Sequence, residues 1–134
     1  MEFSIGNEFS KKFIINEQIV NDFCHLTTDL NPIHLDEEYA RNSLYGMRIV
    51  PGLLLSSFVG AVIGNDFPGK GTIYLSQNIR FVKPVYLNDT IVVKVKITTI
   101  LPNNWLVLET TCLNQLDETV ITGEAKVIPP LIAK

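Results

Sequence analysis

The second half of the chain alternates apolar and polar residues, which is the pattern of strands with one buried face. Residues 92–98 show it most clearly, as Val-Val-Lys-Val-Lys-Ile-Thr. Polar turns at 102–104 and 114–117 divide this half further. We therefore predict a meander of four antiparallel strands, at residues 72–82, 90–100, 105–113 and 119–128.

The first half is mostly helical in its patterning. Residues 3–14 alternate roughly and predict an edge strand or a bent pair. Asn16 is a suitable N-cap for a short helix that ends near Leu26, with apolar residues recurring on one face. Residues 36–41 predict one or two further helical turns, with Asp36 as the cap.

Residues 52–63 form the most apolar element of the chain, with almost no polar face. A helix that is apolar all round is expected to be buried all round. Together with the strands it predicts an α+β hotdog fold, in which one antiparallel sheet wraps around a central buried helix. We expect a single domain over residues 1–134, paired edge to edge in a homodimer. A monomeric α+β sandwich is the alternative that periodicity alone leaves open.

Composition limits the class of function. The net charge is −3 and the basic residues are scattered, which disfavours nucleic acid as a partner. The longest apolar run, 49–64, is interrupted and shorter than the ~18–20 residues that cross a membrane, so we expect no membrane contact. Cys24 and Cys112 are not in a Cys-x-x-Cys pair and only two histidines are present, so we expect no metal. No secretory signal is expected, and we predict buried thiols in a cytoplasmic protein.

The segment from Asp29 to His34 carries the candidate chemistry. It places a carboxylate and an imidazole five residues apart, across Asn31-Pro32. Pro32 fixes its own φ and keeps Asn31 out of the helical region, so we expect a stiff, irregular connection with the Asn31 amide bracing the turn. Such a connection can hold an acid and a base toward one point, as proton transfer requires.

The residues around this segment resemble the hydratase 2 motif of MaoC-like dehydratases and (R)-specific enoyl-CoA hydratases. The resemblance covers about residues 10 to 128 and rests on three motifs in order: Phe23-x-x-Leu26-Thr27-Thr28-Asp29-x-Asn31-Pro32-Ile33-His34 with Ala40 six residues on; Arg48-Ile49-Val50-Pro51-Gly52; and Pro68-Gly69-Lys70-Gly71-Thr72-Ile73-Tyr74-Leu75-Ser76-Gln77 followed by Phe81-x-x-Pro84-Val85-x-x-x-Asp89.

The resemblance implies a homodimeric enzyme that adds water to trans-2-enoyl-CoA and forms (R)-3-hydroxyacyl-CoA, in fatty-acid or polyhydroxyalkanoate metabolism. It implies that Asp29 and His34 are the catalytic pair. It also implies that the backbone N–H of Gly52 binds the thioester oxygen. Coenzyme A is then part of the substrate, and no separate cofactor is expected.

Two positions depart from the family pattern. Thr28 stands where glycine is frequent, at a position that varies in the family. Pro51 stands where histidine is usual, and proline offers neither an N–H nor a ring nitrogen. The departure at Pro51 changes the surroundings of the thioester but leaves Asp29, His34 and the Gly52 amide in place.

Further residues are candidates for binding substrate. The central helix is expected to line an acyl pocket, and Asn31 is a further candidate for contact with the substrate. Ser56 can instead bond a helix carbonyl. The candidates for the acyl chain are Leu55, Ser56, Phe58, Val59 and Ile63. The candidates for binding the coenzyme A phosphates are Arg80, Lys83, Arg48 and Lys70. For each of them, a solvated surface charge is the alternative.

Other functions stay open on the sequence alone. Dehydration of 3-hydroxyacyl groups on acyl carrier protein uses the same chemistry in reverse. It would require a basic patch at the mouth of the substrate tunnel, which a chain of net charge −3 does not indicate. Thioesterase activity is a less favoured alternative, and it would be detected by the release of free thiol. A non-catalytic hotdog that binds acyl thioesters is the alternative of a different class, and Pro51 is its support.

Overall fold

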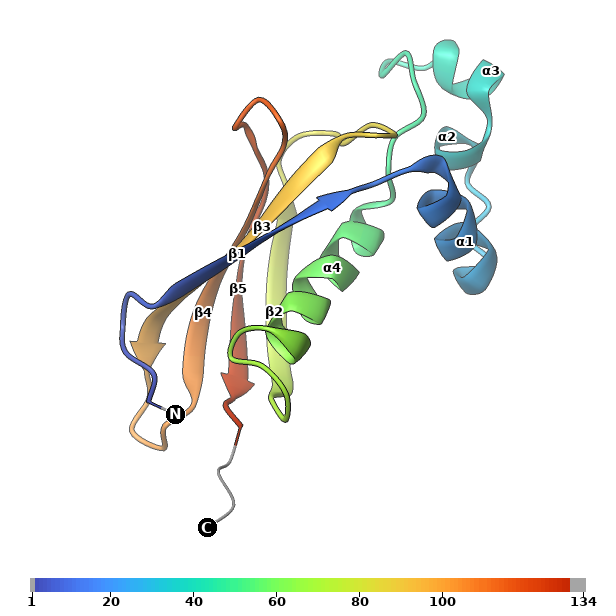
Figure 1. Ribbon diagram of the computed structural model, residues 1–134. Helices are drawn as coiled ribbons and strands as arrows, with labels where there is room; N and C mark the ends of the chain where they lie inside the picture. Colours follow the sequence, from blue (N-terminus) through green and yellow to red (C-terminus); the bar gives the residue numbers. More distant parts are fainter. Residues whose placement is uncertain (1, 131–134) are drawn as a thin grey trace.

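The computed structural model describes residues 2–130, and its main feature is one five-stranded antiparallel sheet (Figure 1). The strand order is β1-β3-β4-β5-β2. The strands are β1 (Glu8–Ile14), β2 (Ile73–Phe81), β3 (Thr90–Ile100), β4 (Leu106–Leu113) and β5 (Thr119–Ile128). The predicted strands are therefore confirmed to within a residue or two in the second half, whereas only part of 3–14 is a strand.

The meander is shorter than predicted. Strands β3, β4 and β5 are sequential neighbours, but β2 pairs with β5 and not with β3. The reason is the connection from β2 to β3, which crosses the sheet from the β2 edge to the position beside β1. On the way it docks on the chain before α4, where Val50 N–H donates to Val85 O at 2.7 Å and Ile49 forms a bridge with Tyr86.

Alternation along the strands builds the core. In β3 the buried positions are every second residue, as expected for a strand with one covered face. These side chains are Ile91, Val93, Val95 and Ile97, each at most 1% exposed. They form one hydrophobic cluster with the buried residues of β4, β5 and the central helix.

The central helix is α4 (Gly52–Asn65), which lies across the sheet (Figure 1). The sheet wrapped around this helix confirms the predicted hotdog architecture. The prediction that α4 is buried on every side is wrong for the single chain, because Leu53, Ser57 and Ala61 are exposed. Their spacing of four residues makes one continuous exposed stripe along the helix.

Three short helices lie at one end of the sheet, beyond the start of α4 (Figure 1). They are α1 (Glu17–Thr27), α2 (Pro32–Leu35) and α3 (Glu37–Arg41). Helix α1 does end before Asn31-Pro32, but the connection to His34 is not irregular throughout. Pro32 is the first residue of α2, a position at which its fixed φ favours a helix and its missing N–H costs nothing. His34 therefore lies on a helical turn.

Within residues 2–130, no helix is both long and apolar enough to cross a membrane. In the same part of the chain, no cluster of three or more His, Cys, Asp or Glu side chains is arranged to hold a metal ion.

Candidate active site

Asp29 lies in the tight turn between α1 and α2 and is exposed. The turn begins at Thr28, whose φ of 61° is in the left-handed region. Asp29 N–H donates to the Thr27 hydroxyl at 3.3 Å, and Asp29 Oδ1 accepts from Asn31 N–H at 3.2 Å. The identity of residue 28 therefore affects the stability of the turn, because glycine adopts this left-handed conformation without strain and threonine does not.

Asn31 caps α2 and so supports both members of the pair. Its Oδ1 accepts from Ile33 N–H at 3.2 Å, which confirms that the amide braces the turn. His34 N–H donates to Asn31 O at 3.0 Å, closing the first turn of the helix. Asn31 thus acts on the shape of the segment that carries Asp29 and His34.

The His34 ring is half-buried and its orientation is fixed by Ile49. Nδ1 lies 2.8 Å from the Ile49 carbonyl oxygen. A carbonyl oxygen can only accept, so Nδ1 carries a hydrogen and donates it. In the neutral ring, Nε2 is then the atom with a free lone pair, and it is able to take a proton from water.

Gly52 is the first residue of α4, and Pro51 is its N-cap. Pro51 O accepts from Leu54 N–H at 3.1 Å and from Leu55 N–H at 3.4 Å. The N–H groups of Gly52 and Leu53 come before the first intrahelical hydrogen bonds, and no acceptor for them occurs among residues 2–130. They remain as donors at the positive end of the helix dipole.

The ring of Phe81 lies directly over Gly52. A Cβ atom at Gly52 would come within 2.7 Å of the Phe81 ring. This contact is the reason that only glycine fits here without a shift of the ring. The side chain of Pro51 is buried, so an apolar ring fills the position at which the motif resemblance leads us to expect histidine.

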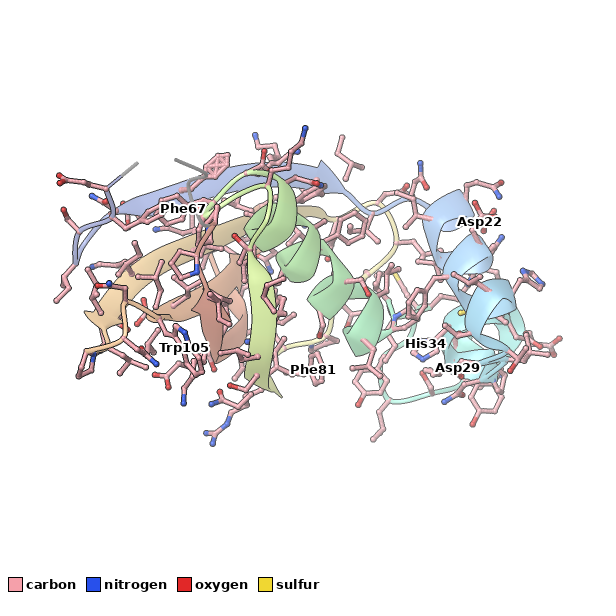
Figure 2. The ribbon with its side chains drawn as sticks, turned by 90° about the horizontal axis from the view of Figure 1, so that it is seen from below. Asp22, Asp29, His34, Phe67, Phe81 and Trp105 are labelled. Atoms are coloured by element: carbon pink, nitrogen blue, oxygen red, sulfur yellow. The ribbon has the colours of Figure 1, made fainter. Side chains whose placement is uncertain are left out.

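Asp29, His34 and Gly52 line one cavity of about 200 Å³, together with Phe23, Thr27, Pro51 and Leu53. Figure 2 shows Asp29 and His34 together beside the start of α4, with Phe81 on the side toward β2. A second cavity of about 460 Å³ shares His34, Gly52 and Leu53 and continues along Phe81 and Lys83. The structure therefore brings the predicted pair and the predicted backbone donor to one place.

The predicted acyl-binding residues lie in different surroundings. Leu55 lines the larger cavity. Val59 and Ile63 have no exposed surface and lie in the core. Phe58 packs against Phe13 with ring centroids 4.6 Å apart. Ser56 donates to Gly52 O at 3.2 Å, the helix bond that the sequence also allowed.

The predicted phosphate-binding residues also lie in different surroundings. Lys83 lines the larger cavity and is ion-paired with Glu118. Arg80 is exposed on β2. Arg48 was a candidate for coenzyme A phosphates, and that prediction is wrong, because its side chain is 4% exposed and its N–H groups are already hydrogen-bonded inside the protein.

Sequence reasoning missed two parts of the site. The Ile49 carbonyl orients His34, but a backbone acceptor leaves no signal in the residue types. Phe81 covers Gly52, and its only signal was its place in the third motif. Both contacts join segments that are far apart in the sequence.

Cys24 lies in the core and does not add a nucleophile to the site. Its side chain is fully buried. Burial raises the pKa of the Cys24 thiol, and the nearby carboxylate of Asp29 raises it further, against a smaller opposite effect of Arg48. The thiol therefore stays protonated at neutral pH.

Comparison with known proteins places this chain in a family. A family model described as "MaoC like domain" matches residues 5–112. The chain belongs to the MaoC-like family. An (R)-specific enoyl-CoA hydratase of Rhodospirillum rubrum is 35% identical over 93% of this chain and 87% of its own length. An (R)-specific enoyl-CoA hydratase of Aeromonas caviae is 36% identical over 90% of both chains.

Two R-hydratases with solved structures share the whole fold. An unliganded R-hydratase of Pseudomonas aeruginosa superposes with a TM-score of 0.93 at 33% identity, covering 99% of this chain and 90% of that one. The (R)-hydratase of Aeromonas caviae involved in polyhydroxyalkanoate biosynthesis gives 0.93 at 32% identity, covering 96% and 98%. All of these relatives are named hydratases, and the chain is accordingly a hydro-lyase.

Proposed function

We propose that this MaoC-like protein is an (R)-specific enoyl-CoA hydratase, which reversibly converts trans-2-enoyl-CoA to (R)-3-hydroxyacyl-CoA. The observation that carries the proposal is the single cavity shared by Asp29, His34 and the free N–H end of α4. The two relatives named (R)-specific enoyl-CoA hydratase support this substrate. The involvement of the Aeromonas caviae hydratase in polyhydroxyalkanoate biosynthesis supports a role in that pathway or in fatty-acid metabolism.

The site can carry out each part of a hydration. Asp29 and His34 hold one water through the carboxylate and Nε2. As the water oxygen bonds to the β-carbon, the pair takes one proton from the water and returns one proton to the α-carbon. The pair therefore ends each turnover in its original protonation state, and a positioned group of this kind contributes ~10²–10⁴-fold to the rate.

The N-terminus of α4 stabilises the thioester. Negative charge develops on the thioester oxygen during the addition, and the Gly52 N–H is a preorganised donor for it. The donor lies at a helix N-terminus, where negative charge is favoured. Pro51 contributes no polar group to this side of the cavity, so stabilisation of the oxygen comes from the backbone.

The assay uses the loss of absorbance of the enoyl-thioester band of crotonyl-CoA, followed by chiral analysis of the 3-hydroxybutyryl-CoA formed. The expected product is the R isomer. The same enoyl group on acyl carrier protein is measured in parallel, because a 3-hydroxyacyl-[acyl-carrier-protein] dehydratase of Solanum lycopersicum is also 34% identical over 94% of this chain. Faster turnover on the carrier protein, or an S product, contradicts the proposal. Tight binding of the CoA thioester without turnover indicates a non-catalytic domain instead.

We also propose a homodimer joined edge to edge through β2. Both β1 and β2 are edge strands, but they differ in their outer surfaces. Edge strands of monomers are commonly protected by charged side chains. Strand β1 carries Glu8, Lys11 and Lys12, whereas β2 exposes Ile73 at 55%, Leu75 at 41% and Phe81 at 47%. The exposed stripe of α4, led by Leu53 at 67%, gives a second copy further apolar surface to cover.

Sedimentation of the purified chain tests the dimer. Leu75→Lys places a charge on the β2 edge and is expected to shift the protein to a monomer. Ile14→Lys is the matched control, since Ile14 is 60% exposed on the other edge strand and is expected to leave the dimer intact. A wild-type monomer contradicts the proposal. The two free, buried cysteines support a cytoplasmic location for this dimer, which cell fractionation tests.

A further inference from the structure

Arg48 is the only charged side chain that is buried among residues 2–130. A guanidinium has five N–H donors and keeps its charge at all relevant pH values. Taking such a charge out of water is unfavourable unless it is paired and hydrogen-bonded. The partners of Arg48 therefore indicate what this side chain holds together.

Those partners come from all three helices of the catalytic end. On α1, Nη1 donates to Glu17 Oε2 at 2.5 Å and Nη2 donates to Asn21 Oδ1 at 2.8 Å. On α3, Nη1 lies 3.4 Å from Glu37 Oε1. On α2, Nε donates to the backbone carbonyl of His34 at 2.7 Å. Arg48 thus joins α1 and α3 to the residue that carries the proposed base.

The bond to His34 matters because α2 is a single turn of four residues. A turn of this length is not stable by itself, and the carbonyl groups near its end have no partner within the helix. Arg48 supplies that partner. Its neighbour Ile49 adds two further bonds, from Ile49 N–H to Ile33 O at 3.2 Å and from His34 Nδ1 to Ile49 O at 2.8 Å.

We propose that Arg48 is a positioning residue of the active site, whose guanidinium sets the orientation of the α2 turn and so of the His34 imidazole. The inference rests on the proposed hydratase function and names a residue for it that does not touch substrate. Arg48 acts on both the main chain and the ring of His34, because the main chain of its neighbour Ile49 accepts from the ring. The segment that begins at Arg48 leads within four residues to Gly52, so it also ties the base to the thioester-binding end of α4.

Lysine cannot replace Arg48 in this role. An ammonium is a point charge on a flexible stem, whereas the planar guanidinium reaches the His34 carbonyl and the α1 and α3 side chains at the same time. Arg48→Lys keeps the charge and loses part of this network. Arg48→Met keeps the approximate length and loses all of it. The two variants are therefore expected to form a graded series.

The first experiment measures kcat and KM of the full-length chain with crotonyl-CoA. Because small misplacements of catalytic groups are costly, kcat is expected to fall by roughly 10- to 100-fold in Arg48→Met, and by less in Arg48→Lys. KM is expected to change by less than about threefold, since Arg48 does not contact the thioester. Wild-type kcat in folded Arg48→Met overturns the inference. An increase in KM at constant kcat also overturns it, because that pattern belongs to a substrate-binding residue.

Two control variants separate positioning from loss of stability. Arg41→Met makes the same change at an exposed arginine of α3 and is expected to leave kcat unchanged. Leu106→Ala opens the core near Trp105, at the end of the sheet away from His34 (Figure 2). Leu106→Ala is expected to lower the urea concentration at the midpoint of unfolding and to leave kcat unchanged. A fall in kcat of Leu106→Ala equal to that of Arg48→Met overturns the positioning role.

A second readout does not depend on turnover. The ¹⁵N NMR signals of the His34 ring report its tautomer and surroundings, and they are expected to shift in Arg48→Lys but not in Arg41→Met. If wild-type protein hydrates none of the thioesters, the proposed function fails, and this spectrum alone decides the inference. An Arg48→Lys protein with unchanged His34 signals overturns it.

Discussion

His34 Nδ1 lies 2.8 Å from the carbonyl oxygen of Ile49, and this one contact determines which ring nitrogen can do chemistry. The contact joins a helical turn of the N-terminal region to the segment leading into α4. Because the carbonyl accepts, the hydrogen of the neutral ring is held on Nδ1 and the lone pair is on Nε2. The proposed base is thus oriented by the same segment that leads into α4, the helix proposed to bind the thioester.

The tautomer of His34 can be observed directly. We expect ¹⁵N NMR at a pH where the ring is neutral to show a protonated Nδ1 and an unprotonated Nε2. His25→Ala removes the only other histidine and assigns the signals. His25 is exposed, and among residues 2–130 its ring is hydrogen-bonded to Asn21 O of its own helix, so its loss is not expected to disturb the site. A His34 ring protonated on Nε2 alone contradicts the arrangement.

Gly52→Ala tests the close contact of Gly52 with Phe81. The added Cβ would lie 2.7 Å from the ring, so we expect overpacking to cost about 1–3 kcal/mol of unfolding free energy and kcat to fall roughly tenfold or more. Gly64→Ala is the control, because a Cβ at Gly64 of the same helix meets nothing within 4 Å. In a Phe81→Ala background the stability cost of Gly52→Ala should shrink. An equal cost in both backgrounds would show that the ring is not responsible.

Thr28→Gly is expected to stabilise the protein. Thr28 has a φ of 61°, and a left-handed conformation costs a non-glycine residue roughly 1–2 kcal/mol. Part of this gain is offset by the greater freedom of glycine in the unfolded chain, so we expect a net gain of about 1 kcal/mol in urea unfolding. Thr27→Gly should instead destabilise, since Thr27 is helical and its hydroxyl bonds to Phe23 O at 2.9 Å. A loss of stability in Thr28→Gly contradicts the account of the turn.

The two cysteines are expected to resist thiol reagents in the folded protein. Burial raises the pKa of Cys112 from 9.0 to about 12, which lowers its thiolate fraction near pH 8 by about 10³-fold. Burial also raises the pKa of Cys24. A raised thiol pKa favours the folded state at low pH, so stability should fall as pH rises from about 9 toward 12. Rapid labelling of either thiol in the native protein at pH 8 would contradict the burial of Cys24 and Cys112.

Features that depend on local patterning were predictable from the sequence. Alternation in β3, the turns after Ile100 and Leu113, and the apolar run from Gly52 each depend on neighbours within one element. The spacing of Asp29 and His34 across a proline is also visible in the sequence. These features located the pair and the helix beside it.

The remaining features depend on distant contacts. Arg48 resembles a surface cation in the sequence, because nothing near it reveals that Glu17, 31 residues away, is its partner. The exposed stripe of α4 is missed because composition gives the apolarity of a helix but not what covers it. The irregular connection predicted at His34 treats Pro32 as a helix breaker, whereas at the first position proline begins a helix.

The most direct test of the proposed catalytic pair is kcat/KM for crotonyl-CoA in two matched pairs of variants. Asp29→Asn is compared with Asp22→Asn, and His34→Ala with His25→Ala. Figure 2 shows Asp22 well away from Asp29 and His34. We expect Asp29→Asn and His34→Ala each to lose ~10²–10⁴-fold in kcat/KM while remaining folded, and both controls to keep wild-type rates. Wild-type turnover in either Asp29→Asn or His34→Ala would contradict the account.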